Sequence, residues 1–365
     1  MAYIQNYQDN NSIIKMKKAI YPLRFVPQPA ERVWGGHRLA TQFHKPFDPE
    51  KLIGESWEIS GFEDGSSVID GGWLDGNPLF DVIETYMDEI VGDDNYKRFG
   101  DEFPILVKLL DINDRLSVQV HPDDDTAFDR HNSYGKNEAW YVLEADPDAR
   151  IYMGFNKDMD VPEFLDRCAK GTLEEVLNVV TPHKGDFFFI EAGTVHSAGG
   201  GLVIAEIQQL SDVTYRIYDW GRENNPATAR QMHVDQALSC INYRKYDSGS
   251  LFVPAGMSGP SKPLVSNKYF TANELALAQP LRIWPDRYES FILYTCLEGE
   301  AEVIPSDNSG RYPLRRGEWS LIPAAMSDFV LAPVAPGTHV MEVYIGRQEE
   351  KDDYIKSSVL WKNNR

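Results

Sequence analysis

The chain has 365 residues, of which 42% are hydrophobic, and it carries a formal net charge of −20. This length and apolar content predict either two domains or one large domain with insertions. No stretch of 18 apolar residues is present, which argues against a membrane span, and the acidic charge argues against binding to nucleic acid. A small anionic substrate remains possible if lysines and arginines gather in one cleft.

The N-terminal residues MAYIQNYQDNNSIIK contain no apolar core followed by a cleavage site, so they do not read as a secretory signal. We expect residues 1–18 to form a flexible extension. The three cysteines, Cys168, Cys240 and Cys296, lie far apart and show no CxxC spacing. This pattern is typical of the reducing cytoplasm, the predicted location, and argues against a disulfide framework or a thiolate zinc site.

Short apolar runs broken by glycine and proline fill residues 19–80, and they predict short strands joined by turns. Two segments, 34–36 (WGG) and 54–58 (GESWE), are rich enough in aromatic residues to line a site, although a packed β core explains them equally well. From 78 to 99 apolar residues recur at helical spacing, which predicts an amphipathic surface helix.

The strand predicted over residues 103–111 (FPILVKLLD) is apolar except for Lys108. A lysine in such a run either extends its amine to solvent at a sheet edge or is held inside for a purpose, and the sequence leaves both possibilities open. The next strand, residues 117–121 (SVQVH), alternates polar and apolar residues, so Gln119 and His121 share one face.

A second alternating run begins near Lys136 and places Lys136, Glu138 and Trp140 on one face. If the two strands are neighbours in a small barrel, Gln119, His121 and Glu138 converge on one metal ion, with Lys136 beside it. Alternatively, Glu138 is the partner of a buried salt bridge and Gln119 is a core amide bonded to the backbone.

Helical patterns interrupt the strands over about residues 155–182. Asp160 with Glu163, and Thr172 with Glu175, have the spacing of helix N-terminal capping pairs. Apolar residues recur at helical spacing at Leu173, Val176, Leu177 and Val180. We therefore expect a helical hairpin that forms a lid or wall over the pocket.

Residues 185–196 (GDFFFIEAGTVH) combine a glycine turn, an apolar strand, a second turn and His196. This order resembles the second sequence motif of cupins, in which a Gly, five residues, a Pro-x-Gly turn and a His follow one another. Glu191 stands where that motif usually has proline. His196 is therefore a further candidate metal ligand.

Strand alternation returns over residues 202–222, where Arg216 lies among aromatic and aliphatic residues. A buried arginine without an anionic partner is destabilising, so Arg216 requires an anion. The partner is either Asp212 or Asp219 in a salt bridge, or an anionic substrate. We favour the substrate, because the strand follows His196 closely and should lie in the same barrel.

The segment LFVPAGMSGPSKP, residues 251–263, is rich in Gly, Pro and Ser and predicts a linker. Beyond it, Gly317 and Pro323 repeat the frame of the cupin-like motif, but Met326 stands where the first copy has His196. We therefore predict a mainly β fold with two cupin-like barrels (jelly rolls) and a helical insertion in the first half. The metal-binding catalytic domain covers 19–250, and a barrel without metal ligands covers 251–365.

Four motifs, SVQVHPDD, YGKNEAWYVL, EAGTVHS and SDVTYRIYDWGR, together closely resemble the type I mannose-6-phosphate isomerases in their shorter bacterial form. The resemblance runs from about Tyr21 to the C-terminus. It implies the interconversion of mannose 6-phosphate and fructose 6-phosphate through an enediol, with one Zn²⁺ per chain, and catalytic roles for Arg216 and Lys136. The implied metal ligands are Gln119, His121, Glu138 and His196. Lys108 joins Lys136 and Arg216 as a candidate substrate contact, and Lys108 and Arg216 are the candidates for binding the phosphate.

Two other classes of function use the same pattern. A cupin oxygenase would hold iron at these ligands, although Gln119 and the adjacent Lys136 fit an isomerising metal better. A non-catalytic sugar-binding module would keep the pocket and need no metal. The sequence predicts a sugar phosphate as the small-molecule partner and carries no signal for an oligomeric state.

Overall fold

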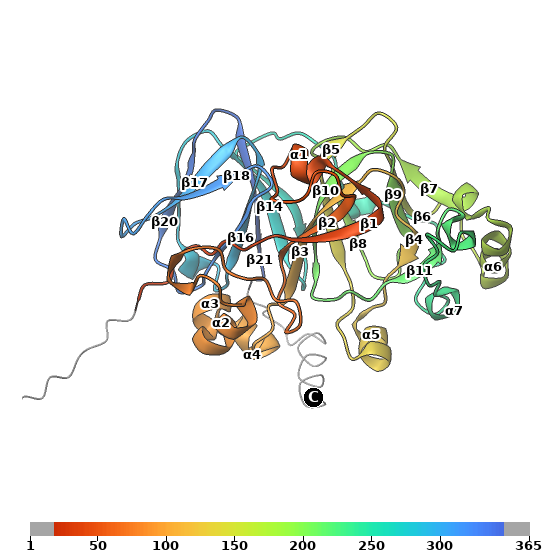
Figure 1. Cartoon of the computed structure of the whole chain (residues 1–365), viewed down its shortest axis with the longest axis horizontal. Helices are drawn as coiled ribbons and strands as arrows, with labels where there is room; N and C mark the ends of the chain where they lie inside the picture. Colours follow the sequence, from red (N-terminus) through yellow and green to blue (C-terminus); the bar gives the residue numbers. More distant parts are fainter. Residues whose placement is uncertain (1–17, 347–365) are drawn as a thin grey trace, which may run out of the picture.

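The computed structural model describes residues 18–346, so residues 1–17 of the predicted extension lie outside the described residues. The fold is mainly β, as predicted, and its four sheets form two barrels side by side (Figure 1). Among residues 18–346, no helix combines the length and the apolar character needed to cross a membrane.

The first barrel consists of two sheets that share one apolar core. The larger sheet contains, in spatial order, β1 (Gln28–Gly36), β2 (Ile53–Ile59), β3 (Ile105–Ile112), β10 (Leu202–Gln209), β5 (Glu138–Ala145), β8 (Phe187–Ile190) and β12 (Phe252–Val253). The smaller sheet contains β11 (Tyr215–Tyr218), β4 (Val118–Val120), β9 (His196–Gly199), β6 (Arg150–Phe155) and β7 (Leu177–Val180). Leu110 and Trp140 of the larger sheet meet Ile151 and Met153 of the smaller one inside this barrel.

The second barrel is built in the same way. Its larger sheet contains β13 (Ser261–Ser266), β14 (Thr271–Leu277), β21 (Thr338–Tyr344), β16 (Ile292–Glu298) and β19 (Trp319–Ile322). Its smaller sheet contains β15 (Leu281–Ile283), β20 (Phe329–Pro333), β17 (Glu300–Pro305) and β18 (Tyr312–Arg315). Tyr294 and Phe329, from opposite sheets, meet in its core.

The two barrels pack against each other through their larger sheets. Leu106 and Ala205 of the first barrel belong to the same apolar cluster as Leu293 and Met341 of the second. Strands β3, β10, β5 and β8 are therefore covered on both faces, which explains why their sequences are nearly continuous apolar runs. A polar residue in such a strand can only point into the first barrel or into the contact between barrels.

The segment 78–99 forms three short helices, α2 (Leu79–Tyr86), α3 (Asp88–Val91) and α4 (Asp93–Phe99), so the prediction of one helix is wrong. The chain breaks at Met87 and Gly92, whose φ angles of 51° and 91° lie outside the helical region. The predicted apolar face is confirmed for Leu79, Val82, Ile83 and Ile90, which are all buried, but Tyr86 is half-buried and Met87 is 45% exposed.

The helical hairpin predicted for residues 160–182 is also wrong. Helix α6 (Val161–Lys170) begins at Asp160, whose carboxylate accepts the backbone N–H of Glu163 at 2.8 Å, as predicted. Thr172 makes no capping bond, and Leu173–Val176 forms only a 3-10 turn. Residues Leu177–Val180 then pair with β6 and form strand β7 at the edge of the smaller sheet.

The ends of the predicted linker take part in sheets. Strand β12 pairs with β8 of the first barrel, and β13 begins at Ser261, so the linker is shorter than predicted. At the other end, the backbones of Leu23 and Leu321 exchange hydrogen bonds of 2.8 and 2.9 Å, which fixes the start of the described chain to the second barrel. The division of the chain between residues 250 and 251 stays a prediction. The remaining α-helices are α1 (Arg38–Thr41), α5 (Asp124–His131) and α7 (Val234–Ala237).

Candidate active site

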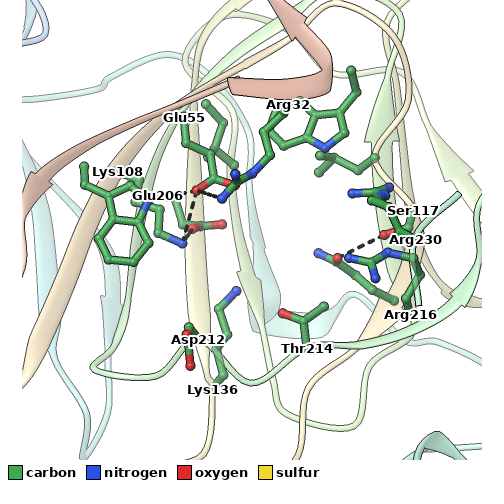
Figure 2. A pocket seen from close by; sticks show the side chains of 15 residues that line it. Arg32, Glu55, Lys108, Ser117, Lys136, Glu206, Asp212, Thr214, Arg216 and Arg230 are labelled. Carbon is green, nitrogen blue, oxygen red and sulfur yellow. Dashed lines mark hydrogen bonds and ion pairs between the residues drawn. The ribbon is translucent and has the colours of Figure 1, made fainter. Parts of the chain in front are cut away.

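A cavity of about 390 Å³ opens into the first barrel between its two sheets (Figure 2). Trp34 and Trp57 line it, which favours the site interpretation of the segments 34–36 and 54–58 over simple core packing. Its charged lining residues are Arg32, Glu55, Lys108, Lys136, Glu206, Asp212, Arg216 and Arg230. No residue of the segment 160–182 lines the cavity, so the predicted role of that segment as a lid or wall is wrong.

The smaller sheet supplies a row of three polar side chains. Arg216 on β11 lies opposite Gln119 on β4, and Gln119 lies opposite His196 on β9. Residues directly opposite one another on antiparallel strands project from the same face, so this row points into the barrel. His121 directly follows β4 and is buried beside the row.

The larger sheet supplies the facing row. Trp57, Lys108, Glu206 and Trp140 lie opposite one another across β2, β3, β10 and β5. Glu138 precedes Trp140 by two residues and therefore shares its face. The expectation that the strands of Gln119 and Glu138 are neighbours is wrong: β4 and β5 belong to different sheets. The two sheets face each other, so these side chains meet across the barrel interior.

His121, Glu138 and His196 form the one group of His, Cys, Asp or Glu side chains in residues 18–346 with the spacing of a metal site. His196 Nε2 lies 3.2 Å from Glu138 Oε1, and His121 Nε2 lies 3.4 Å from Glu138 Oε2. One ligand atom from each of the three residues lies within 4.8 Å of the others, which is close enough for the three to share one ion.

Backbone carbonyls orient both imidazoles. Val213 O lies 3.0 Å from Nδ1 of His121, and Thr194 O lies 2.9 Å from Nδ1 of His196. Because a carbonyl can only accept a hydrogen bond, each Nδ1 carries the proton and each Nε2 lone pair faces Glu138. Burial, assisted by the charge of Lys136, lowers the pKa of His121 to about 3, so this ring is neutral, the form that binds metals.

Glu138 is fully buried, and neither of its oxygens accepts a hydrogen bond of acceptable geometry. Burial acts to raise the pKa of this carboxyl, but the charge of Lys136, whose Nζ lies 2.9 Å from Glu138 Oε2, holds the pKa well below its usual range. A carboxylate without hydrogen bonds, beside two imidazole nitrogens, offers the oxygen and nitrogen donors that a divalent cation binds.

Lys136 is buried beside this cluster, and its Nζ lies 3.3 Å from His121 Nε2. Burial alone lowers the pKa of this amine, but the carboxylates, Glu138 first, reverse the effect and raise the pKa above its usual value. Lys136 is therefore an ammonium group in this arrangement.

Arg216 has no carboxylate partner within 4.0 Å among the described residues, so neither salt bridge considered from the sequence is formed. Asp219 binds Arg222 and Arg230 instead. Arg216 donates from Nη1 to the carbonyl of Gln231 at 2.7 Å, and its Nε is buried without a hydrogen bond. The guanidinium thus keeps donors for an anion in the cavity.

Comparison with known proteins identifies the family. Residues 23–149 match the model of the phosphomannose isomerase type I catalytic domain. The mannose-6-phosphate isomerase of Streptococcus mutans is 32% identical over 305 residues, which cover 83% of this chain and 92% of that protein. The chain belongs to the mannose-6-phosphate isomerase family. The mannose-6-phosphate isomerase ManA of Bacillus subtilis is 31% identical over 312 residues, covering 85% of this chain and 95% of that protein.

The fold agrees with this family. A crystal structure of a mannose 6-phosphate isomerase from Bacillus subtilis superposes with a TM-score of 0.77 at 27% identity, and covers 89% of this chain and 99% of that one. The family, the mainly β fold and the membership in the isomerase class, all predicted from the sequence, are confirmed.

Sequence reasoning missed several charged residues of this isomerase site. Glu206 lies in the apolar strand LVIAEIQQ, where a lone acidic residue is the same signal that singled out Lys108. The two form a pair, with Lys108 Nζ 3.6 Å from Glu206 Oε1 and 3.9 Å from Glu55 Oε2. Lys108 is thus held inside rather than extended to solvent. Burial, and then the charge of Glu138, raises the pKa of Glu206.

Proposed function

We propose that this isomerase interconverts mannose 6-phosphate and fructose 6-phosphate by moving a proton between C1 and C2 through an enediol. Family membership supports the substrate, since the relatives described above are named for it. The observation that carries the proposal is the buried His121–Glu138–His196 cluster. It lies directly behind Gln119 and Lys136, which line a cavity rich in cationic side chains and contact His196 and Glu138 at 3.3 and 2.9 Å.

In this proposal one Zn²⁺ is held by the two Nε2 atoms of His121 and His196, by Glu138, and by Gln119. The amide nitrogen of Gln119 lies 3.3 Å from His196 Nε2, and a half-turn of the amide group presents its oxygen at the same place. A bound zinc ion supplies Lewis-acid chemistry: it polarises a carbonyl and stabilises negative oxygen without redox change.

The side chains of the chain supply the remaining functions. Lys136, as an ammonium group, neutralises Glu138 and donates hydrogen bonds to substrate oxygens. Arg216 offers a planar fork of donors to an anionic oxygen. Glu206 faces the cavity with a raised pKa, which suits a group that exchanges a proton with a sugar carbon near neutral pH. Glu138 stays ionised as a metal ligand, so Glu206 rather than Glu138 is proposed as the base.

A coupled assay on mannose 6-phosphate, with and without a chelator, tests this function. Chelation should abolish turnover, and Zn²⁺, or Co²⁺ or Mn²⁺, should restore it, since N and O ligands do not select one metal strongly. Elemental analysis should find one metal ion per chain. Full activity in metal-free protein would contradict the role of the metal, and activity that requires O₂ would favour the oxygenase alternative.

Glu206→Gln tests the proton transfer separately. The variant should keep its metal content, and kcat should fall by about 10²-fold or more, the usual contribution of a positioned acid or base. Unchanged kcat would remove Glu206 from the mechanism. The cytoplasm stays the predicted location, which the three free cysteines support.

A further inference from the structure

The cavity has one end where positive charge exceeds negative charge. We propose that Arg230, fixed by the buried carboxylate of Asp219, forms with Arg216 the phosphate-binding end of the cavity. This inference rests on the proposed function for the identity of the sugar, but not for the binding of a phosphate group.

Carboxylates already neutralise the cations on the opposite side. Arg32 binds Glu55 through Nε at 2.7 Å and Nη2 at 3.1 Å, and Lys108 lies near both Glu55 and Glu206. A phosphate dianion placed there would meet two carboxylates and be repelled by them. Of the two phosphate candidates named from the sequence, Lys108 is therefore the weaker one.

The Arg216 side lacks such compensation. Arg216 pairs with no carboxylate within 4.0 Å among residues 18–346, and Arg230 shares the single carboxylate of Asp219 with Arg222. Figure 2 shows Arg216 and Arg230 together on one side of the cavity, away from Glu55 and Lys108. Burial, followed by the charge of Arg230, lowers the pKa of Arg216, which agrees with two cations crowded at one place.

Asp219 holds Arg230 in a fixed orientation. Its side chain is fully buried, and it accepts from Arg230 Nε at 3.0 Å and from Arg230 Nη2 at 2.6 Å. This two-point contact orients one edge of the guanidinium toward the protein and leaves Nη1 without a bond inside the described structure. Arg230 also lines the cavity, so an anion there meets a pre-oriented donor group.

The strand register sets a suitable distance from the metal cluster. Arg216 lies opposite Gln119, and Gln119 opposite His196, on three adjacent strands. Two strand spacings amount to about 10 Å between the backbones of Arg216 and His196. A substrate with C1 and C2 at the metal cluster would therefore extend its far end, which carries the phosphate, toward Arg216 and Arg230.

Two titrations test this inference in Arg230→Gln and in the matched control Arg222→Gln. Arg222 binds the same Asp219 but points to Asp114 and the carbonyl of Arg115, and it does not line the cavity. Calorimetry with inorganic phosphate at constant ionic strength measures anion binding directly. Steady-state kinetics on mannose 6-phosphate measure KM and kcat.

In Arg230→Gln we expect the phosphate affinity to fall and the KM to rise by about tenfold or more, since charge-assisted hydrogen bonds are lost. The kcat should stay within about threefold, because the chemistry occurs at the other end of the cavity. Arg222→Gln should change neither constant by more than about twofold. Thermal unfolding checks that each variant folds. Arg230→Lys, which keeps the charge but loses the fork, gives an intermediate loss and serves if Arg230→Gln does not fold.

Unchanged phosphate affinity in Arg230→Gln would overturn the inference, and so would an equal loss in Arg222→Gln, since the effect would then come from disturbing Asp219. A different outcome separates the two proposals. If the wild-type chain binds inorganic phosphate through Arg230 but does not isomerise mannose 6-phosphate, the phosphate-binding end stands and the proposed function fails.

Discussion

Glu55 is the centre of the charged network on the larger sheet, and its removal gives a quantitative test. Besides its two bonds from Arg32, it accepts the indole N–H of Trp57 at 2.8 Å, and its side chain is 12% exposed. Burial acts to raise the pKa of this carboxyl, but Lys108 and Arg32 overcome burial and lower it to about 2.

The lowered pKa translates into a pH-dependent part of the folding free energy. Moving a carboxyl pKa from its ordinary 4.5 in the unfolded chain to about 2 in the folded one corresponds to ~3 kcal/mol of stability at neutral pH. Because the folded pKa is the lower one, this stability is complete above the unfolded pKa and is lost as the pH falls toward 2. More than half of it is gone by about pH 3.

At pH 7 the free energy of unfolding of Glu55→Gln, measured by urea denaturation, should therefore be ~3 kcal/mol lower than that of the wild-type chain. The difference between the two proteins should shrink to about 1 kcal/mol at pH 3, and comparing them removes the effect of other titrating groups. Glu31→Gln is the matched control on the neighbouring strand β1, since Glu31 pairs with Lys51 where both side chains are more than half exposed, and it should change nothing measurable. A difference that stays constant from pH 7 to pH 3 would refute this reasoning.

The remaining predictions concern the site and the scaffold. Arg216→Ala should keep its metal and lose kcat/KM on mannose 6-phosphate by about 10²-fold or more, whereas His196→Ala should also lose the metal, as elemental analysis would show. Glu58→Gln should lower the free energy of unfolding, measured in urea, by about 3–5 kcal/mol. The buried amine of Lys45, which lies 2.6 Å from Glu58 Oε2 in the wild-type chain, would lose its counter-charge. Asp160→Ala should cost about 1 kcal/mol, and Thr172→Ala clearly less, because only Asp160 caps a helix. Equal effects of these two substitutions, an unchanged urea midpoint in Glu58→Gln, or full activity in Arg216→Ala would each contradict the corresponding prediction.

Alternation along single strands predicted which side chains share a face, and this was sufficient to group the candidate ligands. The period of two in SVQVH placed Gln119 with His121, and the same period placed Lys136 with Glu138. It could not predict that these strands lie in facing sheets, because the neighbours of β4 are β9 and β11 and those of β5 are β8 and β10, all of them later in the chain. Strand order depends on packing between distant segments and leaves no local signal.

The same limit explains which residues were missed. Arg230 lies outside any strand, and its place in the cavity depends on a turn after β11 that returns it to Asp219. No period marks such a residue. In the segment 78–99, the apolar spacing gave most of the buried face, but it could not show that Met87 would adopt a positive φ, end the first helix and stay exposed.

The second barrel shows what separates a candidate site from a shared fold. It keeps the glycine turn at Gly317, with φ 76°, but it has no histidine at the matching place. His196 follows Gly185 by eleven residues, and the residue eleven after Gly317 is Asp328, not Met326 as predicted; Asp328 accepts a hydrogen bond from Arg282 at 2.6 Å. Its interior also holds a carboxylate, Glu342, which accepts the hydroxyl groups of Tyr288 and Tyr294 at 2.7 Å each.

A buried carboxylate whose hydrogen bonds are complete has no need of a cation. Glu138 is equally buried but accepts no hydrogen bond, and two imidazoles face it with their lone pairs. The difference between the barrels is therefore not the fold around the carboxylate but the partners supplied to it, tyrosine hydroxyl donors in one, and two histidines and the ammonium group of Lys136 in the other. This is why the metal and the chemistry are assigned to the first barrel, and why Arg216 and Arg230, which line that same cavity, are the arginines assigned to the substrate's phosphate.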